Sequence, residues 1–321
     1  MSVSRPTLVL APMRGVTTLY YRQAFVQHFA GLDCVMAPFI PTVSAERINP
    51  KLLKEVLPEN NGDLPLIPQL ISNNADDFVQ MAVALADLGY DEVNLNMGCP
   101  HKPIRKKRRG SGLLPHPDLV EALLDPICAR SPIKVSVKVR LGVADKSELL
   151  KLVPVLNRFP LSEIIVHPRT AEQMYDGSVD LEAFAEAYAA LTLPVCYNGD
   201  IDSLAFFQNV QHRFPAIHRF MLGRGLLANP FLCEEIKGID SSVEHIQRIT
   251  AFHDDLVGRY EAVLHGDYSV LGKMKEFWIY QTRHLSNGSK MFKKLKKAQR
   301  LSTYKEIVCE FLSAAEWVRP V

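Results

Sequence analysis

Short apolar segments recur about every thirty residues up to residue 238, and a longer segment with helical periodicity follows most of them. The apolar segments are rich in Val, Ile and Leu, as short buried strands are, and lie at 8–13, 33–38, 66–71, 92–97, 135–141, 163–167, 195–198 and 219–222. Amphipathic stretches lie between them, several opening on an Asp or Ser suited to capping, for example at 76–88, 118–129, 180–190 and 203–212. Eight strand–helix units in succession predict an α/β fold, a TIM (β/α)8 barrel.

The pattern changes after Gly238, where only helical segments follow, at about 243–264, about 270–285 and, as a final pair, within 291–317. We therefore expect two domains: a catalytic barrel over 1–238 and an all-helical domain over 239–321. A doubly wound sheet is the alternative for the first part, but Ala-Pro-Met-Arg-Gly at 11–15 is not the Gly-rich dinucleotide turn which that fold carries after its first strand.

The length and composition bound the class of protein. With 321 residues, 47% of them hydrophobic, the chain can bury one large core with a smaller attachment. No apolar run reaches the roughly 18 residues of a membrane span, and residues 1–5 lead into a strand rather than a signal peptide. We expect a cytoplasmic protein with no membrane partner. The six cysteines lack CxxC or His-rich spacing, which argues against disulfides and against a metal site.

Polar residues follow the predicted strands, at the barrel edge where active sites form. In the segment 135–141 strict alternation places Ser136, Lys138 and Arg140 on the inward face. Two inward cations without an acid nearby in sequence favour an anionic ligand over an interior ion pair. Asn198-Gly199-Asp200 and Gly223-Arg224 follow the seventh and eighth strands, where TIM barrels often bind phosphate. Such turns commonly serve chain reversal alone, but together with Lys138 they predict a phosphorylated cofactor.

One cysteine, Cys99, lies just past the fourth strand on a loop shaped by Gly98 and Pro100. At the barrel mouth beside cationic strand ends, its thiol could exchange a proton with a ligand. The other five cysteines are expected to be small core hydrophobes. The same loop carries six cations among residues 102–109. Residues 273–305 carry ten Lys or Arg against the single acid Glu276. A solvated helix face is one interpretation of that second run; the two runs together indicate a polyanionic partner larger than a metabolite.

Seven short motifs, in order at the predicted strand ends, are similar to those of the tRNA-dihydrouridine synthases, a family that the chain resembles over almost its whole length. They are Ala-Pro-Met at 11–13, Pro-Gln-Leu at 68–70, Leu-Asn-Met-Gly-Cys-Pro at 95–100 with Gly-Ser-Gly-Leu-Leu at 110–114, Val-Lys-Val-Arg at 137–140, Val-His-Pro-Arg-Thr at 166–170, Asn-Gly-Asp at 198–200 and Gly-Arg-Gly at 223–225. The family fold is an FMN-binding TIM barrel with a C-terminal helical domain.

The resemblance implies roles for individual residues. Cys99 would protonate C5 of a uracil in tRNA after reduced flavin delivers hydride to C6, with NADPH as the reductant. The substrate residues would be Asn96, Arg140 and Arg169. One chain would hold a complete site, so we expect a monomer. FMN would bind against Pro12, Met13 and Arg14, with Gln69, Lys138 and His167 at the ring or ribityl chain and Asn198, Gly199, Asp200, Gly223 and Arg224 at the phosphate.

Three features depart from the family pattern: Pro168 where Gly is common, the strongly basic stretch at 104–109, and Pro-His-Pro at 115–117 in place of an acid. They indicate a divergent branch and bear on which uridine is modified. Two other functions remain open: an FMN-dependent reductase or dehydrogenase of a free pyrimidine, which would have little use for the basic tail, and a non-catalytic RNA-binding barrel, against which the intact cofactor and cysteine motifs argue.

Overall fold

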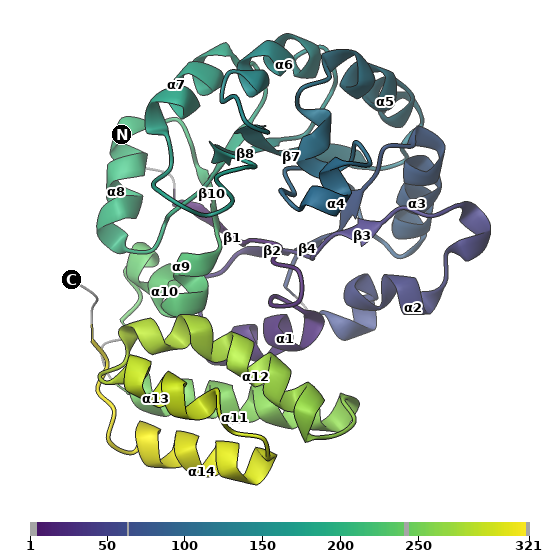
Figure 1. The fold of residues 1–321 in the computed structure, drawn as a ribbon. Coiled ribbons are helices and arrows are strands. Elements are labelled where there is room, and N and C mark those ends of the chain that lie inside the picture. The colour runs from purple at the N-terminus through teal and green to yellow at the C-terminus, as the bar shows by residue number, and fades with distance from the viewer. Residues whose placement is uncertain (1–4, 63, 241–243, 319–321) are drawn as a thin grey trace.

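A computed structural model of the chain describes residues 5–62, 64–240 and 244–318. Its strands form one parallel sheet in the order β3-β5-β6-β7-β8-β9-β10-β1-β2-β4, and Figure 1 shows this sheet curled into a barrel-like inner layer surrounded by helices. The strands are β1 Thr7–Leu10, β2 Cys34–Met36, β3 Ile40–Pro41, β4 Leu66–Ile67, β5 Gln69–Ile71, β6 Glu92–Met97, β7 Lys134–Gly142, β8 Ile164–Thr170, β9 Val195–Asn198 and β10 Arg219–Leu222. All eight predicted strand segments are confirmed.

The third predicted strand, 66–71, is interrupted at Pro68, which has no N–H to donate to a ladder. Its first half, β4, pairs with β2, while its second half, β5, pairs with β6. The two ends of the curled sheet therefore meet at this short segment of chain. The two-residue β3 pairs with β5 and was not predicted.

Helices on the outside of the sheet cover its apolar surface (Figure 1). The four predicted ones are confirmed as α3 Ala75–Asp87, α5 Pro117–Arg130, α7 Leu181–Ala190 and α8 Leu204–Arg213. Asn74, Asp180 and Ser203 cap α3, α7 and α8 by accepting a backbone hydrogen bond in the first turn. Further helices are α1 Leu19–His28, α2 Pro50–Leu53, α6 Glu148–Leu156, α9 Arg224–Ala228, α10 Leu232–Lys237 and the 3-10 turns η1 Ala45–Arg47, η2 Lys54–Val56 and η3 Pro58–Asn60. The short α4 Lys102–Arg105 and the 3-10 turn η4 Gly110–Leu113 lie in the connection between β6 and α5, at the carboxyl ends of the strands (Figure 1).

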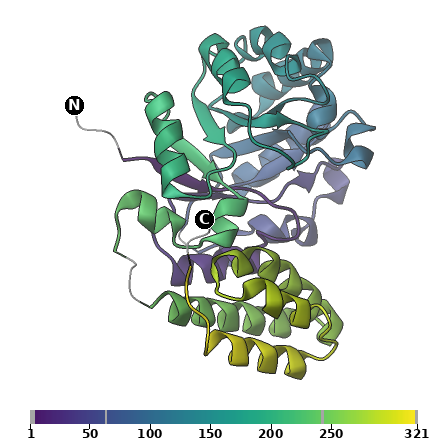
Figure 2. The same ribbon diagram turned by 60° about the vertical axis from the view of Figure 1, so that its left-hand side comes forward.

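Beyond Gly238, which ends α10 in the left-handed conformation at φ 65°, the described residues form helices and one isolated bridge between Leu285 and Trp317. They are α11 His245–Val263, α12 Asp267–Gln281, η5 Thr282–His284, α13 Gly288–Leu295 and α14 Leu301–Leu312. The expected start of the first helix, Val243, lies outside the described residues. Figure 2 shows these helices as a layer below the curled sheet, on the side of α1.

The core explains this arrangement. Inside the curl, inward-facing residues of six strands, with Ala11 just after β1, form a small apolar cluster: Val9, Ala11, Cys34, Met36, Ile67, Ile165, Cys196 and Met221. Outside it, a second cluster runs from the sheet through the surrounding helices into α11–α14. Phe29, directly after α1, meets Phe252 of α11 edge to face at 5.1 Å between ring centroids. Because the two parts share this cluster, the proposed division at residue 238 stays a prediction. Among the described residues, no helix is long and apolar enough to cross a bilayer.

Candidate active site

A cavity of about 680 Å³ opens at the carboxyl ends of the strands, where polar side chains from separate β–α loops meet. Fourteen of the fifteen residues expected at the site line it: Pro12, Met13, Arg14, Asn96, Cys99, Lys138, Arg140, His167, Arg169, Asn198, Gly199, Asp200, Gly223 and Arg224. Convergence follows from the parallel topology, since every strand delivers its carboxyl end to the same edge.

The fifteenth, Gln69, is fully buried and does not line the cavity. Its amide donates to Asn94 Oδ1 at 2.8 Å, and its Oε1 accepts a hydrogen bond from Asn96 Nδ2 at 2.9 Å. Gln69 therefore fixes the amide orientation of Asn96 from behind. Its expected place at the ring or ribityl chain of FMN stays a prediction.

Cys99 lines the cavity and is held there by its backbone. Asn96 Oδ1 accepts hydrogen bonds from the N–H groups of Cys99 at 2.9 Å and Gly98 at 3.1 Å, and Ser111 Oγ donates to the Cys99 carbonyl at 2.8 Å. At Gly110, φ is 58° and an added Cβ would lie 2.9 Å from Cys99 Cβ, so only glycine allows this loop to pack here.

Burial raises the pKa of the Cys99 thiol, although a hydrogen bond from the His101 backbone and the charges of Arg140, Arg14 and Lys138 lower it in part. The net rise keeps the thiol protonated at neutral pH, which is the form a proton donor requires. The expectation of buried cysteines is confirmed for Cys34, Cys196 and Cys233; Cys128 is half-buried. The expectation is wrong for Cys309, which is exposed because it lies on the outer face of α14.

Lys138 extends from β7 into the cavity and donates to Asn198 Oδ1 at 2.7 Å. Asn198 is held in turn by its Nδ2, which donates to the Met221 carbonyl at 2.8 Å. Burial, reinforced by the charge of Arg140, lowers the pKa of Lys138 to about 7. No carboxylate pairs with Lys138 among the described residues, so an anion in the cavity would stabilise its charged form.

Arg140 is also buried without a carboxylate among the described residues, and backbone carbonyls orient it instead. It donates to the carbonyls of Gly98 at 3.1 Å, Thr170 at 2.9 Å and Met174 at 2.7 Å. Burial lowers its pKa to about 10, which leaves it charged at neutral pH. It lies 5.2 Å from the centre of the Tyr175 ring. Rigid backbone acceptors therefore aim a full positive charge at the space beside Cys99.

Asp200 organises the far side of the cavity from a left-handed backbone conformation at φ 48°. Its carboxylate accepts from Arg169 at 2.9 Å and from Arg224 at 3.1 Å. Arg169 is 2% exposed, so its contacts favour holding the loop over binding substrate directly. His167 is buried, and desolvation together with the nearby Arg and Lys charges lowers its pKa well below the usual value, leaving a neutral imidazole.

The donor set fits a flavin mononucleotide. Six cations line the cavity, Arg14, Lys138, Arg140, Arg169, Arg224 and Arg283, against three carboxylates, Asp200, Asp202 and Glu276, an excess suited to a phosphorylated ligand. Glycine brings the two expected phosphate loops together: a Cβ on Gly225 would lie 2.0 Å from the Ile201 carbonyl oxygen. The loops after β9 and β10 thus meet beside Asp200 and Arg224.

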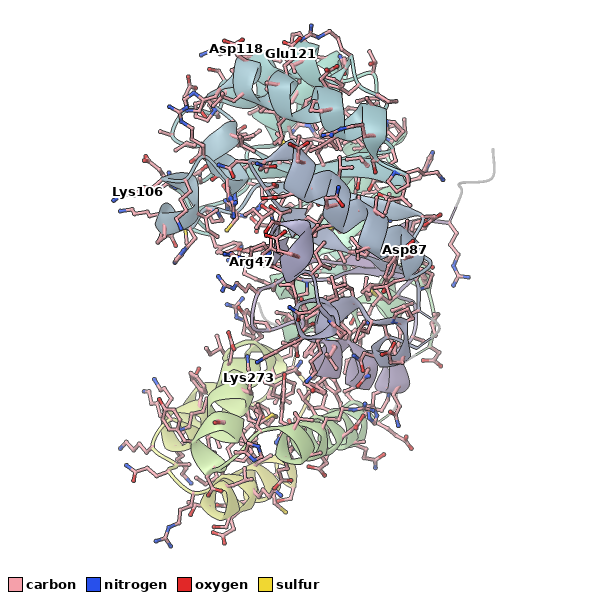
Figure 3. All side chains as sticks on the ribbon, turned by 90° about the vertical axis from the view of Figure 1, so that its right-hand side faces the viewer. Arg47, Asp87, Lys106, Asp118, Glu121 and Lys273 are labelled. Carbon is pink, nitrogen blue, oxygen red and sulfur yellow. The ribbon has the colours of Figure 1, made fainter. Side chains whose placement is uncertain are left out.

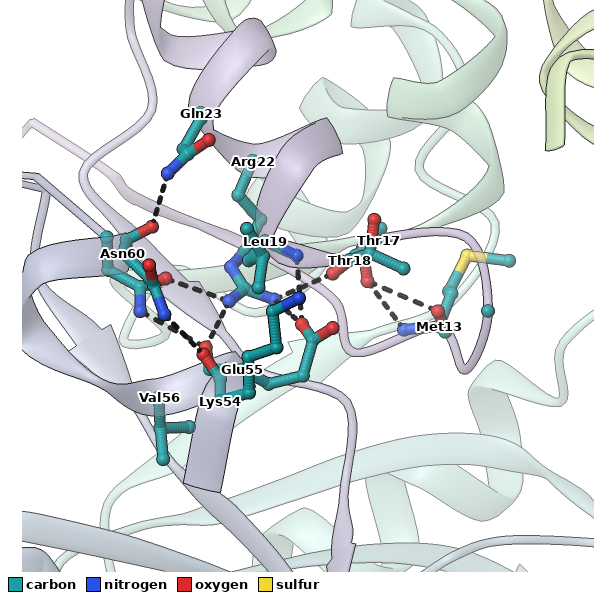
Figure 4. A network of polar contacts seen from close by, with 12 residues as sticks. Met13, Thr17, Thr18, Leu19, Arg22, Gln23, Lys54, Glu55, Val56 and Asn60 are labelled. Atoms are coloured by element: carbon teal, nitrogen blue, oxygen red, sulfur yellow. Dashed lines mark hydrogen bonds and ion pairs between the residues drawn. The ribbon is translucent and has the colours of Figure 1, made fainter. Parts of the chain in front are cut away.

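The β1–α1 loop, which contributes Met13, is fixed by a buried network (Figure 4). Thr17 Oγ1 accepts from the Met13 N–H at 2.8 Å, and the Thr17 carbonyl accepts from Arg22 at 2.9 Å. Arg22, whose side chain is 3% exposed, also pairs with Glu55 at 3.0 Å. This network links the cavity wall to the 3-10 turn η2, which contains Glu55.

Sequence reasoning missed several residues of the cavity, and three of them come from the C-terminal helices. Glu276 and Tyr280 of α12 and Arg283 of η5 line it. Their spacing of four and three residues places them on one helix face, and Glu276 is the one acid in an otherwise basic stretch. That spacing could have suggested a shared contact, but not that the contact lies at the barrel mouth. Met174, Tyr175 and Phe39 were missed as well.

Basic side chains lie at the surface on both sides of the cavity. Lys106, Lys107 and Arg108 after α4 are exposed, and none of them pairs with a carboxylate in the described part of the chain. Figure 3 shows Lys106 on the opposite side of the molecule from Asp87. On α13, Met291 and Leu295 face the core, and the exposed face carries Lys293 and Lys294, followed by Lys296 and Lys297.

Known proteins share both the sequence pattern and the fold. The family model described as "Dihydrouridine synthase (Dus)" matches residues 9–316. A "Probable tRNA-dihydrouridine synthase" of Rhodobacter capsulatus is 28% identical, covering 81% of this chain and 80% of the relative. One of Staphylococcus epidermidis is 26% identical over 97% of this chain and 95% of the relative.

Solved structures extend the comparison to the fold. The old yellow enzyme from Trypanosoma cruzi superposes with a TM-score of 0.53 at 9% identity, over 72% of this chain and 88% of that one. A morphinone reductase mutant in complex with tetrahydroNAD superposes with a TM-score of 0.52 at 11% identity, over 73% of this chain and 87% of that one. At such low identity the likeness is one of fold alone.

Proposed function

The chain belongs to the dihydrouridine synthase family, and we propose that it reduces specific uridines of tRNA to 5,6-dihydrouridine with FMN as its cofactor. The observation that carries the proposal is the composition of the cavity. It is lined by the protonated thiol of Cys99, by two basic side chains that pair with no carboxylate among the described residues, Lys138 and Arg140, and by the neutral imidazole of His167. Reduction of the uracil C5=C6 bond needs a hydride at C6 and a proton at C5. In a cavity of this composition the thiol can supply the proton, and there is room for a cofactor that supplies the hydride.

FMN, when bound, would supply the hydride. The residues that would hold it are Pro12, Met13 and Arg14 at one wall, Lys138, Asn198 and His167 at the floor, and Gly199, Asp200, Gly223 and Arg224 at the phosphate end. Its phosphate would add negative charge near Arg224, whose position Asp200 fixes. The neutral His167 can donate one hydrogen bond without adding further charge to a crowded cationic site.

Cys99 would hold the transferable proton on Sγ. Addition of hydride at C6 leaves negative charge spread over C5 and the adjacent carbonyl oxygen, and the thiol delivers its proton to C5. The nearby Arg140 would stabilise that charge electrostatically because its orientation is set in advance by three backbone carbonyls. The side-chain oxygen of Asn96 accepts hydrogen bonds from the N–H groups of Gly98 and Cys99, so its main effect would be to position the backbone that carries the thiol.

The same proposal includes finer features of the protein. The eight β/α units form a TIM barrel, residues 1–238, and α11–α14 form a helical domain, residues 239–321, that binds tRNA. NADPH reduces the flavin, a monomer is the active species, and the enzyme acts in the cytoplasm. A flipped-out uridine would reach the cavity past the α4 loop and α12.

A reductase of free pyrimidines is the second candidate, and it would use the same cavity. The exposed cations on both sides of the mouth favour RNA over a free base, because a neutral pyrimidine gains nothing from them.

The test is to purify the protein, record its absorbance spectrum, and incubate it with NADPH and unmodified tRNA or free uracil. We expect flavin absorbance and dihydrouridine in tRNA alone. A colourless protein that FMN cannot reconstitute would overturn the enzyme proposal, and turnover of free uracil without turnover of tRNA would favour the second candidate. Mapping dihydrouridine in RNA from cells with and without the gene would identify the modified position.

A further inference from the structure

A second cavity, of about 440 Å³, adjoins the first on the side of the α4 loop. Three residues line both cavities: Pro100, His101 and Met174. Pro100 directly follows Cys99 in the sequence. Whatever occupies the second cavity therefore lies next to whatever Cys99 protonates. This inference rests on the proposed function, since it concerns the RNA around the modified uridine.

The walls of the second cavity suit a planar ring. Pro100, Pro103, Ala171 and Met174 present apolar surface. Unstacked RNA bases are commonly bound between such surfaces and read at their polar edges. Met174 is fixed there despite a left-handed backbone at φ 52°, because its carbonyl accepts from Arg140 at 2.7 Å.

The polar lining offers both a donor and an acceptor. The guanidinium of Arg105 lies 4.0 Å from Glu172, at the limit of an ion pair, with the Arg105 side chain 14% and the Glu172 side chain 62% exposed. Arg105 Nε is buried without a hydrogen-bond partner among the described residues. The outer guanidinium nitrogens make no hydrogen bond within the described residues beyond this 4.0 Å contact, so they are free to donate to a ligand in the cavity.

Neighbouring elements hold the backbone of both residues. The Glu172 N–H donates to the Val143 carbonyl at 3.0 Å. A Cβ on Gly112 would lie 2.5 Å from the Arg105 carbonyl oxygen, so η4 packs directly on α4. Lys102 and Arg105 line the cavity against the one carboxylate of Glu172, so a phosphate is the competing ligand, whereas Glu172 can accept hydrogen bonds from the N–H groups of a base.

We propose that the second cavity binds the base of a nucleotide adjacent to the target uridine and prefers guanine, with Arg105 donating to O6 and Glu172 accepting from N1–H and the 2-amino group. Arginine donates well to guanine O6, and only guanine among the four bases combines that acceptor with two donors on the same edge. The α4 loop would thus set part of the sequence context in which Cys99 acts.

The experiment measures kcat/KM for dihydrouridine formation in tRNA transcripts whose nucleotides on either side of the modified uridine are varied one at a time. For the wild-type protein we expect about a tenfold preference for guanine at one of the two sides. Glu172→Gln and Arg105→Met should reduce that preference below about threefold while the flavin content stays unchanged. The matched control is Glu182→Gln, an exposed acid on α7 that lines neither cavity.

Three outcomes would overturn the proposal. The wild-type protein could show no preference at either neighbour, or Arg105→Met could weaken all transcripts equally and flatten the salt dependence, which would identify a phosphate contact. Alternatively, Glu172→Gln could slow flavin reduction by NADPH in the absence of RNA, which would assign the cavity to the dinucleotide. Failure of the proposed function is distinguishable, because the wild-type protein would then form no dihydrouridine in any transcript.

Discussion

Lys273 of α12 donates a hydrogen bond to the carbonyl of Gly15, at 2.7 Å, across 258 residues of sequence. Gly15 follows Arg14 in the β1–α1 loop, so this bond ties a wall of the cavity to the C-terminal helices. Glu276 and Tyr280, one and two turns further along α12, line the cavity itself. The helical part therefore belongs to the active site as well as to the surface beside it.

Replacing Lys273 by Met should remove this tie. A hydrogen bond from a charged donor contributes about 1–3 kcal/mol, so we expect the free energy of unfolding in urea to fall by about 1–2 kcal/mol. Flavin should also dissociate more readily, because the β1–α1 loop loses its outer support. Lys293→Met, at an exposed lysine of α13, is the control. Equal stability of the two variants would show that the bond contributes nothing.

Cys99→Ala should keep its flavin yet form almost no dihydrouridine. Loss of a general acid typically lowers a rate by 10²–10⁴-fold. Among the described residues, no other cysteine lines the cavity that Cys99 lines. Single-turnover reactions of the reduced protein with tRNA measure this step apart from flavin reduction. Cys309→Ala, at an exposed cysteine, should behave as the wild type. Product formation at the wild-type rate in Cys99→Ala would exclude the proton-donor role.

Much of this site could be predicted from sequence because parallel strands bring their carboxyl ends to one edge. Lys138 and Arg140 line the cavity as alternation on β7 predicts, and His167 lines it from within β8. Gln69 also lies on the inner side of the sheet, where it contacts Met36, but its buried hydrogen bonds to Asn94 and Asn96 depend on the neighbouring strand and could not be predicted from local sequence.

Other contacts depend on how distant segments pack. Arg169 is paired with Asp200, 31 residues away, which no local pattern reveals. The positions of Tyr175 and Tyr280 depend on a loop path and on the docking of α12, and those are decided by tertiary contacts. The helices themselves were predictable, whereas the surface that they share with the barrel was not.

The binding of FMN to the cofactor-free protein should depend on pH through Lys138, whose pKa is lowered to about 7. Below pH 7 the side chain is already charged, so affinity should be constant. Above pH 7 it is neutral in the free cavity, so a flavin whose ring or ribityl oxygens accept a hydrogen bond from its ammonium group must bind together with a proton. The dissociation constant should then rise by up to about tenfold per pH unit, until the higher pKa of the complex is reached.

Quenching of flavin fluorescence on binding measures this profile. Lys138→Met should bind FMN weakly and with a flat profile between pH 7 and pH 9, because no ammonium group titrates there. Parallel profiles for the two proteins would assign the pH dependence to another group.

Reversing the charges of Lys293, Lys294, Lys296 and Lys297 to Glu should weaken tRNA binding. These lysines are exposed on and just after α13, and none pairs with a carboxylate among the described residues. If they contact the RNA backbone, each lost phosphate contact should lower the slope of log K against log salt by roughly 0.7–0.9. Filter binding across a salt series measures both quantities. Lys134→Glu, at the amino end of β7 and so at the opposite edge of the sheet, is the control and should leave the slope unchanged. A slope that does not change in the fourfold variant would mean that the α13 lysines are only solvated surface, and that the cations after α4 carry the electrostatic attraction.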